Sequence, residues 1–200
     1  MRRIDDLTVA LATPADPRDP GAYSGWPASL LGGLTAVTGR AIGLNGSLPQ
    51  GVHFAAALAG VVPRVRPADL LAPRGLLPRR MPAPWFLGRP VVMARSARLR
   101  SGLRRLGPAD GCVTLGTELS LPRSLPTVTY QDSTLLQAKR SYPWPYLGEV
   151  SEGDIARFAE RQRAVYRRVR GCCCSSQWAA DSIVSDYGIP RERVHVVGIG

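Results

Sequence analysis

Lysine is nearly absent from this 200-residue chain: of 26 basic residues, against 15 acidic ones, only Lys139 is a lysine. The formal net charge of +11 therefore rests on arginine and at first suggests a nucleic-acid partner. Zinc-finger spacings and aromatic RNA-binding motifs are missing, however, and few aromatic residues lie among the arginines. These absences disfavour nucleic acid as a partner, and an anionic lipid surface or a phosphorylated substrate explains the charge at least as well.

The chain also lacks any apolar run of the length that a membrane helix needs. Its start, "MRRIDD", leads only into the short apolar stretch 7–12, which is too brief for a secretory signal. We therefore expect a cytoplasmic protein, with peripheral attachment to the inner membrane face as an alternative. A hydrophobic content of 44% is enough for one domain with a sizeable core.

Paired cysteine motifs are missing as well. The four cysteines are Cys112 and the consecutive Cys172, Cys173 and Cys174, and the sequence has no C-x-x-C pair. Neighbouring residues on a strand point to opposite faces, so the triplet cannot close a tetrahedral metal site by itself. We expect small apolar side chains in a buried strand of a reduced protein, and neither a metal nor another cofactor.

The sequence does contain a regular alternation of strand-like and helix-like segments. Six short β-type runs are expected at 7–12, 40–46, 111–118, 126–132, 171–176 and 193–198. Helical patterns separate them at 26–39, 53–62, 91–106, 134–140, 151–169 and 178–187. Strands separated by helices of this length predict an α/β fold with a doubly wound, mainly parallel Rossmann-like sheet and helices on both faces.

Local signals mark where several of these helices begin and end. Pro27 suits the first turn of a helix, and Ser151 with Asp154 forms a variant of the capping box. Ser176 is expected to cap the last helix and Gly188 to end it. An irregular stretch rich in proline and arginine, about 63–90, is expected to be an insertion within one domain that spans 1–200.

The loop after the first strand, 13–25, lacks the G-x-G-x-x-G sequence of a dinucleotide site. The chain also lacks a Walker lysine motif, a G-x-S-x-G elbow and an H-E-x-x-H zinc motif. In parallel sheets, ligands bind at the carboxyl ends of the strands, near helix N-termini. The candidate places are therefore the loop after Ala12, the turn 130–133 and the turn 175–177.

Four segments together resemble the N-terminal half of a family 4 glycosyltransferase of the GT-B fold: "YSGWP", "VTYQD", "YPWPYL" and "AVYRRVRGCCCSSQWAADSIVSDYGIPRERVHVVGIG". The resemblance is dense over 127–200, moderate over 7–46 and weak between them. Its most specific block has a strand that ends in Ser176 and then a capped helix. Gly188-Ile189-Pro190, a short basic turn and V-x-V-V-x-x-G complete the block.

This resemblance implies transfer of a sugar from a nucleotide-sugar donor to a sugar or lipid acceptor, with retention of anomeric configuration and without an essential metal. In the family, the glycine turn at Gly200 begins the hinge to a second Rossmann-like domain, which binds the donor. The chain is therefore expected to be the acceptor-side domain alone: a fragment, a truncated reading frame or half of a split enzyme with a separate C-terminal chain. The alternative is a non-catalytic α/β domain that binds an acceptor, an anionic lipid surface or a partner chain.

The resemblance places candidate donor-phosphate and acceptor contacts at Ser24, Gly25, Gln131, Asp132 and Ser176, and it assigns no catalytic residue. Gln131 stands where many members of the family have a histidine, and an amide cannot carry a proton as a histidine does. Asp132 and Ser176 have an alternative role as helix N-caps, and Gly25 as a turn glycine without a ligand.

Two aromatic residues of the loop "SYPWPYLGEV", Trp144 and Tyr146, are further candidates for contact with a sugar. An aromatic ring can stack on a sugar ring, but packing of the loop itself explains the two residues equally well. The sequence does not separate these roles.

Overall fold

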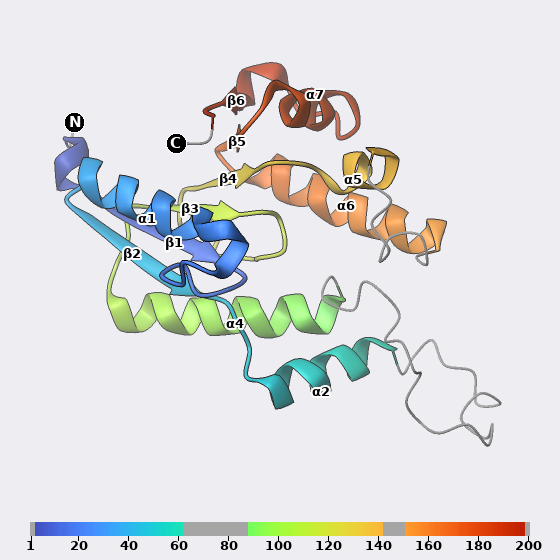
Figure 1. The fold of residues 1–200 in the computed structure, drawn as a ribbon, viewed down its shortest axis with the longest axis horizontal. Coiled ribbons are helices and arrows are strands. Elements are labelled where there is room, and N and C mark those ends of the chain that lie inside the picture. The colour runs from blue at the N-terminus through green and yellow to red at the C-terminus, as the bar shows by residue number, and fades with distance from the viewer. Residues whose placement is uncertain (1–2, 62–87, 142–150, 199–200) are drawn as a thin grey trace.

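A computed structural model describes residues 3–61, 88–141 and 151–198 of the chain. These residues form a six-stranded parallel sheet with the order β2-β1-β3-β4-β5-β6 (Figure 1). The strands are β1 Thr8–Thr13, β2 Arg40–Asn45, β3 Gly111–Leu115, β4 Thr127–Gln131, β5 Gly171–Cys174 and β6 Val194–Val196. The helices are η1 Ile4–Asp6, η2 Ala22–Gly25, α1 Trp26–Val37, α2 Gln50–Val61, α4 Arg89–Leu106, α5 Leu135–Ser141, α6 Glu152–Arg168, α7 Gln177–Ser185 and η5 Arg191–Arg193.

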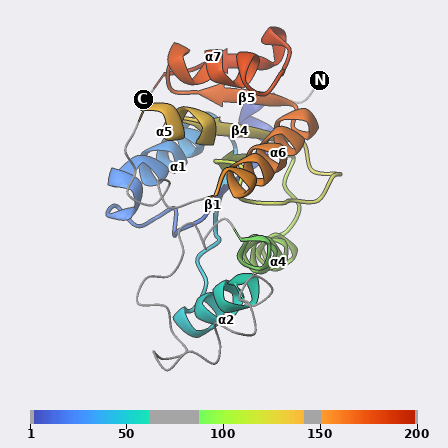
Figure 2. The same cartoon turned by 90° about the vertical axis from the view of Figure 1, so that its right-hand side faces the viewer.

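Helices cover both faces of the sheet, as the sequence predicts. On one face, α1 packs against a cluster that includes Leu11 and Tyr130. On the other face, Leu99 of α4 packs against Ala10, and a further cluster joins α6 and α7 to β5. Figure 2 shows α1 and α6 on opposite sides of the strands. The predicted α/β, Rossmann-like fold class is confirmed.

The winding direction of the chain reverses between β1 and β3. β1 pairs with β2 on one side and with β3 on the other, in a register that runs from Val9 opposite Gly111 to Ala12 opposite Thr114. In doubly wound sheets, the loops after two such strands separate and leave a crevice at their carboxyl ends. This rule places a crevice between the loops that begin at Pro14 and Gly116.

Two helix ends show the capping contacts that the local sequence signals predict. The Ser151 hydroxyl accepts a hydrogen bond of 3.1 Å from the N–H of Asp154, at the start of α6. At the end of α7, Gly188 is left-handed, with φ of +65°, and its N–H donates to the Val184 carbonyl at 3.0 Å. Both signals predicted from the sequence are confirmed, because each depends on neighbouring residues alone.

Strand β3 is shorter than the sequence predicts. It was expected to continue to Glu118 but ends at Leu115, because Gly116 adopts a left-handed conformation with φ of +72°. The Gly116 N–H still bonds to the Tyr130 carbonyl of β4, at 3.0 Å, and the chain then leaves the sheet. This turn carries Glu118 out of the strand and toward the crevice.

The cysteines behave as the small apolar residues that the sequence predicts. Cys112, Cys172 and Cys174 are buried in the sheet, Cys173 is half-buried, and all four are free thiols. Burial raises the pKa of Cys112 and of Cys174 to about 12 and that of Cys172 to about 11. The thiols therefore stay protonated at neutral pH. Among the residues that the structure describes, no three His, Cys, Asp or Glu side chains are grouped to hold a metal ion.

Several predictions fall on other parts of the chain. The proline- and arginine-rich stretch 63–90 lies outside the described residues except at 88–90, and Trp144, Tyr146 and Gly200 lie outside them too. Within the described ranges, no helix has both the length and the apolar character that crossing a membrane requires.

Candidate functional site

A cleft of about 750 Å³ opens at the carboxyl ends of β1, β3 and β4. Its walls come from the loop after β1, the segment 115–120, the turn 130–135 and one face of α6. Three predicted contact residues, Ser24, Gln131 and Asp132, line this one cleft, and Gly25 directly follows Ser24. The structure thus brings together residues that lie more than a hundred positions apart in the sequence.

Gln131 presents an unpaired donor at this cleft. It is the last residue of β4 and is 4% exposed. Its Oε1 accepts a hydrogen bond of 2.9 Å from the hydroxyl of Tyr166 on α6, which fixes the plane of the amide. Its Nε2 is buried and has no hydrogen-bond partner among the described residues. Leaving such a group unpaired costs about 1–3 kcal/mol, which a ligand bound in the cleft beside Gln131 could offset.

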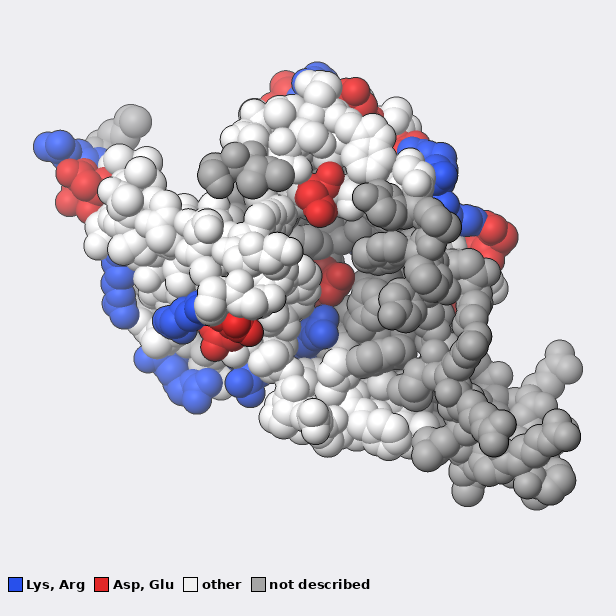
Figure 3. Space-filling model, in the orientation of Figure 1, with Lys and Arg blue, Asp and Glu red and all other residues white. Residues whose placement is uncertain are grey.

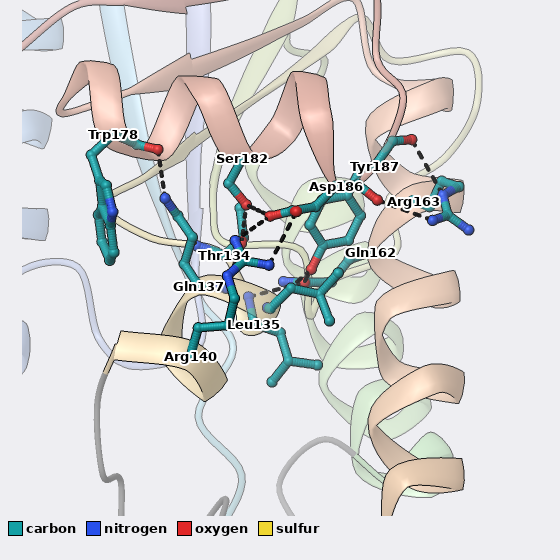
Figure 4. Close-up of polar contacts among 11 residues, drawn as sticks. Thr134, Leu135, Gln137, Arg140, Gln162, Arg163, Trp178, Ser182, Asp186 and Tyr187 are labelled. Carbon is teal, nitrogen blue, oxygen red and sulfur yellow. Dashed lines mark hydrogen bonds and ion pairs between the residues drawn. The ribbon is translucent and has the colours of Figure 1, made fainter.

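A capping box holds the turn that follows Gln131. The Thr134 hydroxyl accepts from the N–H of Gln137 at 3.2 Å, and the Gln137 side-chain carbonyl accepts from the N–H of Thr134 at 3.0 Å. The same hydroxyl lies 2.7 Å from that of Ser182 on α7 (Figure 4). Thr134, and not Asp132, is therefore the cap of α5. The alternative of an N-cap role for Asp132 is wrong, and its exposed carboxylate faces the cleft.

Gln162 ties the same turn to α6 and to the segment after β3. Its Oε1 accepts from the N–H of Leu135 at 3.2 Å and from the Tyr187 hydroxyl at 2.5 Å (Figure 4). Its Nε2 donates to the Thr117 hydroxyl at 2.9 Å. Three walls of the cleft are thereby joined through one side chain, which makes their relative positions rigid.

An ion pair also connects α5 with the residue that follows α7. Arg140 of α5 contacts both carboxylate oxygens of Asp186, at 2.6 and 3.1 Å (Figure 4). The hydrogen bond from Arg140 holds the pKa of Asp186 below its usual value. Asp186 also accepts from Ser182, so α5 is fastened to α7 by charge as well as by the Thr134 contact.

The loop before α1 has a strained backbone. Tyr23 and Ser24 adopt left-handed conformations with φ of 49° and 57°, and Gly25, the N-cap residue of α1, follows with φ of 82°. A left-handed conformation costs a residue other than glycine about 1–2 kcal/mol, and such strain is often found at ligand sites.

The first N–H groups of α1 have no partners within the helix and attract anions. Gly25 therefore combines a conformational role with a position suited to phosphate.

The conformational role of Gly25 can be tested by substitution. We expect Gly25→Ala to lower the free energy of unfolding by about 1–2 kcal/mol, because the new Cβ is strained at this φ and meets the Pro20 carbonyl oxygen at 3.3 Å. Gly32→Ala is the control: it lies within α1, its Cβ meets nothing within 4 Å, and it should stabilise the protein by up to about 1 kcal/mol. Urea denaturation gives both values, and a stabilising Gly25→Ala would contradict the left-handed geometry.

Ser176 is placed differently from the other candidates. Its hydroxyl accepts from the N–H of Ala179 at 3.3 Å, which makes it the N-cap of α7. Ser176 is not among the residues that line the cleft. The structure thus shows the capping role that was left open, and a ligand contact at Ser176 stays a prediction.

Four charged residues that line the cleft were not predicted as site residues from the sequence: Glu118, Arg123, Arg161 and Arg168. Glu118 lines the cleft and forms an ion pair of 3.2 Å with Arg95 of α4. Burial raises the pKa of Glu118, and the charge of Arg95 acts in the opposite direction. The glycine after the apolar run of β3 was the available signal, because Gly116 ends the strand and turns Glu118 toward the cleft.

Comparisons of the chain with models of protein families and with curated proteins found no match. The fold and the cleft define the class: a Rossmann-like α/β domain with a cleft at the switch point of its parallel sheet. The resemblance to family 4 glycosyltransferases rests on the sequence motifs alone.

Proposed function

We propose that residues 1–200 form the acceptor-side domain of a retaining glycosyltransferase of the GT-B type, as the resemblance to family 4 implies. One observation carries the proposal: Ser24, Gln131 and Asp132, chosen as contact residues from the sequence alone, line one cleft at the switch point of the sheet. The substrates of such an enzyme are a nucleotide-sugar and an acceptor that bears a hydroxyl group.

The polar groups of the cleft suit a hydroxyl-bearing acceptor. A hydroxyl group both donates and accepts hydrogen bonds. The buried Nε2 of Gln131 can donate to it, and the exposed carboxylate of Asp132 can accept from it. In this proposal Gln131 positions the acceptor and carries no proton. Positioning of this kind supplies a large part of the rate of a reaction between two substrates.

The start of α1 suits the diphosphate of the donor. Gly25 has no side chain to block approach, and the helix N-terminus favours negative charge. Ser24 lines the cleft directly before it. The donor phosphates and the acceptor hydroxyl would then lie on two sides of the same cleft, as transfer between them requires.

The proposal is tested with a fusion protein, in which the donor-binding domain of a characterised family 4 enzyme follows Gly200. We expect it to release nucleoside diphosphate from at least one member of a panel of nucleotide-sugars when hydroxylated acceptors are added. Asp132→Ala should lower kcat/KM about tenfold to a hundredfold, the effect of losing one hydrogen bond to a charged group. Ser151→Ala, at the exposed N-cap of α6 outside the cleft, is the control and should leave the rate unchanged while lowering stability by about 1 kcal/mol. Equal rates for Asp132→Ala and Ser151→Ala would count against the site.

A basic surface supports a second candidate function, binding of an anionic lipid surface without catalysis. Figure 3 shows Lys and Arg groups along the lower left edge of the face drawn there, where Figure 1 places the C-terminal part of α4. Arg98, Arg104 and Arg105 of this helix are exposed. If the fusion protein releases no nucleoside diphosphate but the chain binds anionic vesicles in a salt-dependent way, this function is favoured instead.

A further inference from the structure

The cleft continues beyond the polar residues at the carboxyl edge. This part of the cleft runs along α6 from Phe158 to Arg168. Phe158, Val165 and Arg168 lie on one face of the helix, and all three line the cleft. Ten residues of helix span about 15 Å, which is about the length of β4. The segment 115–120 and Val92 of α4 form the facing wall. We refer to this extension, between α6 and the segment 115–120, as the α6 groove.

The two ends of the α6 groove differ in chemistry. At the carboxyl edge lie the unpaired Nε2 of Gln131 and the carboxylate of Asp132. At the opposite end lie Arg123 and Arg168, which also line a small adjoining pocket of about 60 Å³ next to Thr127, the first residue of β4. Both arginines are exposed, and neither forms an ion pair with a carboxylate among the described residues.

The walls between these ends are mostly apolar: Phe158, Ala164 and Val165 of α6 line the groove, as does Val92. Two charged residues also lie there, Glu118 and Arg161, and the guanidinium of Arg161 lies 4.7 Å from the centroid of the Phe158 ring. A hydrated sugar chain would bury little apolar surface against such a wall and would gain little binding free energy there. A hydrocarbon chain would bury more apolar surface and bind more favourably. Arginine side chains bind a carboxylate or a phosphate in a bidentate manner, and of these two groups a carboxylate is the one that ends a simple hydrocarbon chain.

From this arrangement we propose that the α6 groove binds an apolar hydroxy acid: its hydroxyl lies at Gln131 and Asp132, its hydrocarbon chain lies along Phe158 and Val165, and its carboxylate lies at Arg123 and Arg168. This ligand would be the acceptor of the proposed sugar transfer, and in that role the inference rests on the proposed function. The hydroxyl accepts from Gln131 Nε2 and donates to Asp132, so it is held where sugar transfer would occur. The carboxylate fixes which end of the chain enters first.

The test is calorimetric titration of the 200-residue chain with ω-hydroxydodecanoate below its micelle concentration, whose chain length is on the order of the 15 Å groove. We expect binding at one site per chain. Dodecanoate, which lacks the hydroxyl, should bind about tenfold more weakly. Dodecyltrimethylammonium should show no binding, and inorganic phosphate, which has no hydrocarbon chain, should bind at least about tenfold more weakly than ω-hydroxydodecanoate. Equal binding of the cationic probe would show a non-specific apolar contact and overturn the proposal.

Three exposed positions on α6 provide matched variants. Arg168→Ala should weaken binding of ω-hydroxydodecanoate about tenfold, as expected for loss of one charged hydrogen-bond partner. Arg167→Ala removes a neighbouring exposed arginine that does not line the groove and should change the affinity less than about twofold. Ala164→Trp fills the groove and should abolish binding. If Arg168→Ala and Arg167→Ala have equal affinities, or if Ala164→Trp binds normally, the α6 groove is not the site.

The outcome is separable from that of the transferase test. Release of nucleoside diphosphate that depends on Asp132, without binding of ω-hydroxydodecanoate, would reject the acceptor class and leave the proposed function in place. Binding that depends on Arg168, without such release, would support the groove and reject the transfer.

Discussion

Replacing Tyr166 with alanine should lower the free energy of unfolding by about 3–5 kcal/mol, the range for loss of a fully buried aromatic side chain. Tyr166 is 0% exposed and packs edge-on against Tyr187, with ring centroids 5.1 Å apart. The substitution removes this packing between α6 and α7 and leaves a cavity that the surrounding helices and sheet can fill only in part. Domains of this size have a total stability of about 5–15 kcal/mol, so the variant should be marginally folded. Urea denaturation followed by circular dichroism measures the change.

Two further variants separate packing from hydrogen bonding at this position. Tyr166→Phe keeps the ring but removes the donor to Gln131 Oε1, which then lies buried without a partner. We expect a loss of about 1–3 kcal/mol, smaller than for alanine. Phe54→Ala, at a half-exposed aromatic residue of α2, should change stability by no more than about 0.5 kcal/mol. If Phe54→Ala and Tyr166→Ala have similar effects, Tyr166 does not hold the core as described.

The Tyr166 contact also connects stability with the site. The hydroxyl of Tyr166 sets the orientation of the Gln131 amide and so fixes the position of its unpaired Nε2. Without it the amide can rotate and present its oxygen instead, which exchanges a donor for an acceptor. The Tyr166→Phe variant should therefore bind a hydroxyl-bearing ligand more weakly even where it remains folded.

Much of the fold could be predicted because its signals are local. The Ser151 and Ser176 caps and the glycine that ends α7 involve residues within a few positions of one another, and the sequence locates all of them. The parallel sheet followed from the alternation of strands and helices, since that spacing leaves few other arrangements. The premature end of β3 was missed because a β-type residue pattern continues past Gly116, whereas the left-handed backbone of that glycine does not.

The contacts within the site could not be predicted in the same way. The Tyr166 hydroxyl meets Gln131 across 35 positions, and Arg95 meets Glu118 across 23. Each contact depends on how a helix lies on the sheet, and residue spacing does not give that angle. The role of Thr134 was missed for a related reason: Asp132 and Thr134 are both good capping residues, and the register of α5 against α7 decides between them.

The described residues have one sheet, and the cleft at its carboxyl edge is lined by loops, turns and helices that belong to that one sheet. In a GT-B enzyme the reaction takes place between two Rossmann-like domains, and the second domain holds most of the donor. Under the proposed function, one domain can bind an acceptor but cannot align it with the anomeric carbon or exclude water. Alignment alone accounts for up to about 7–11 kcal/mol of barrier reduction in well-oriented reactions.

Residues 1–200, assayed by themselves with a panel of nucleotide-sugars and hydroxylated acceptors, should therefore show no transfer. The same residues with a donor-binding domain fused after Gly200 should be active, and the ratio of the two rates should exceed about 10⁵, as the loss of alignment implies. The donor-binding domain alone is the control and should also be inactive. Supplying it as a separate chain should restore only part of the rate, because the two chains must first associate. Transfer by residues 1–200 alone would contradict the two-domain proposal, since a single domain would then hold both substrates.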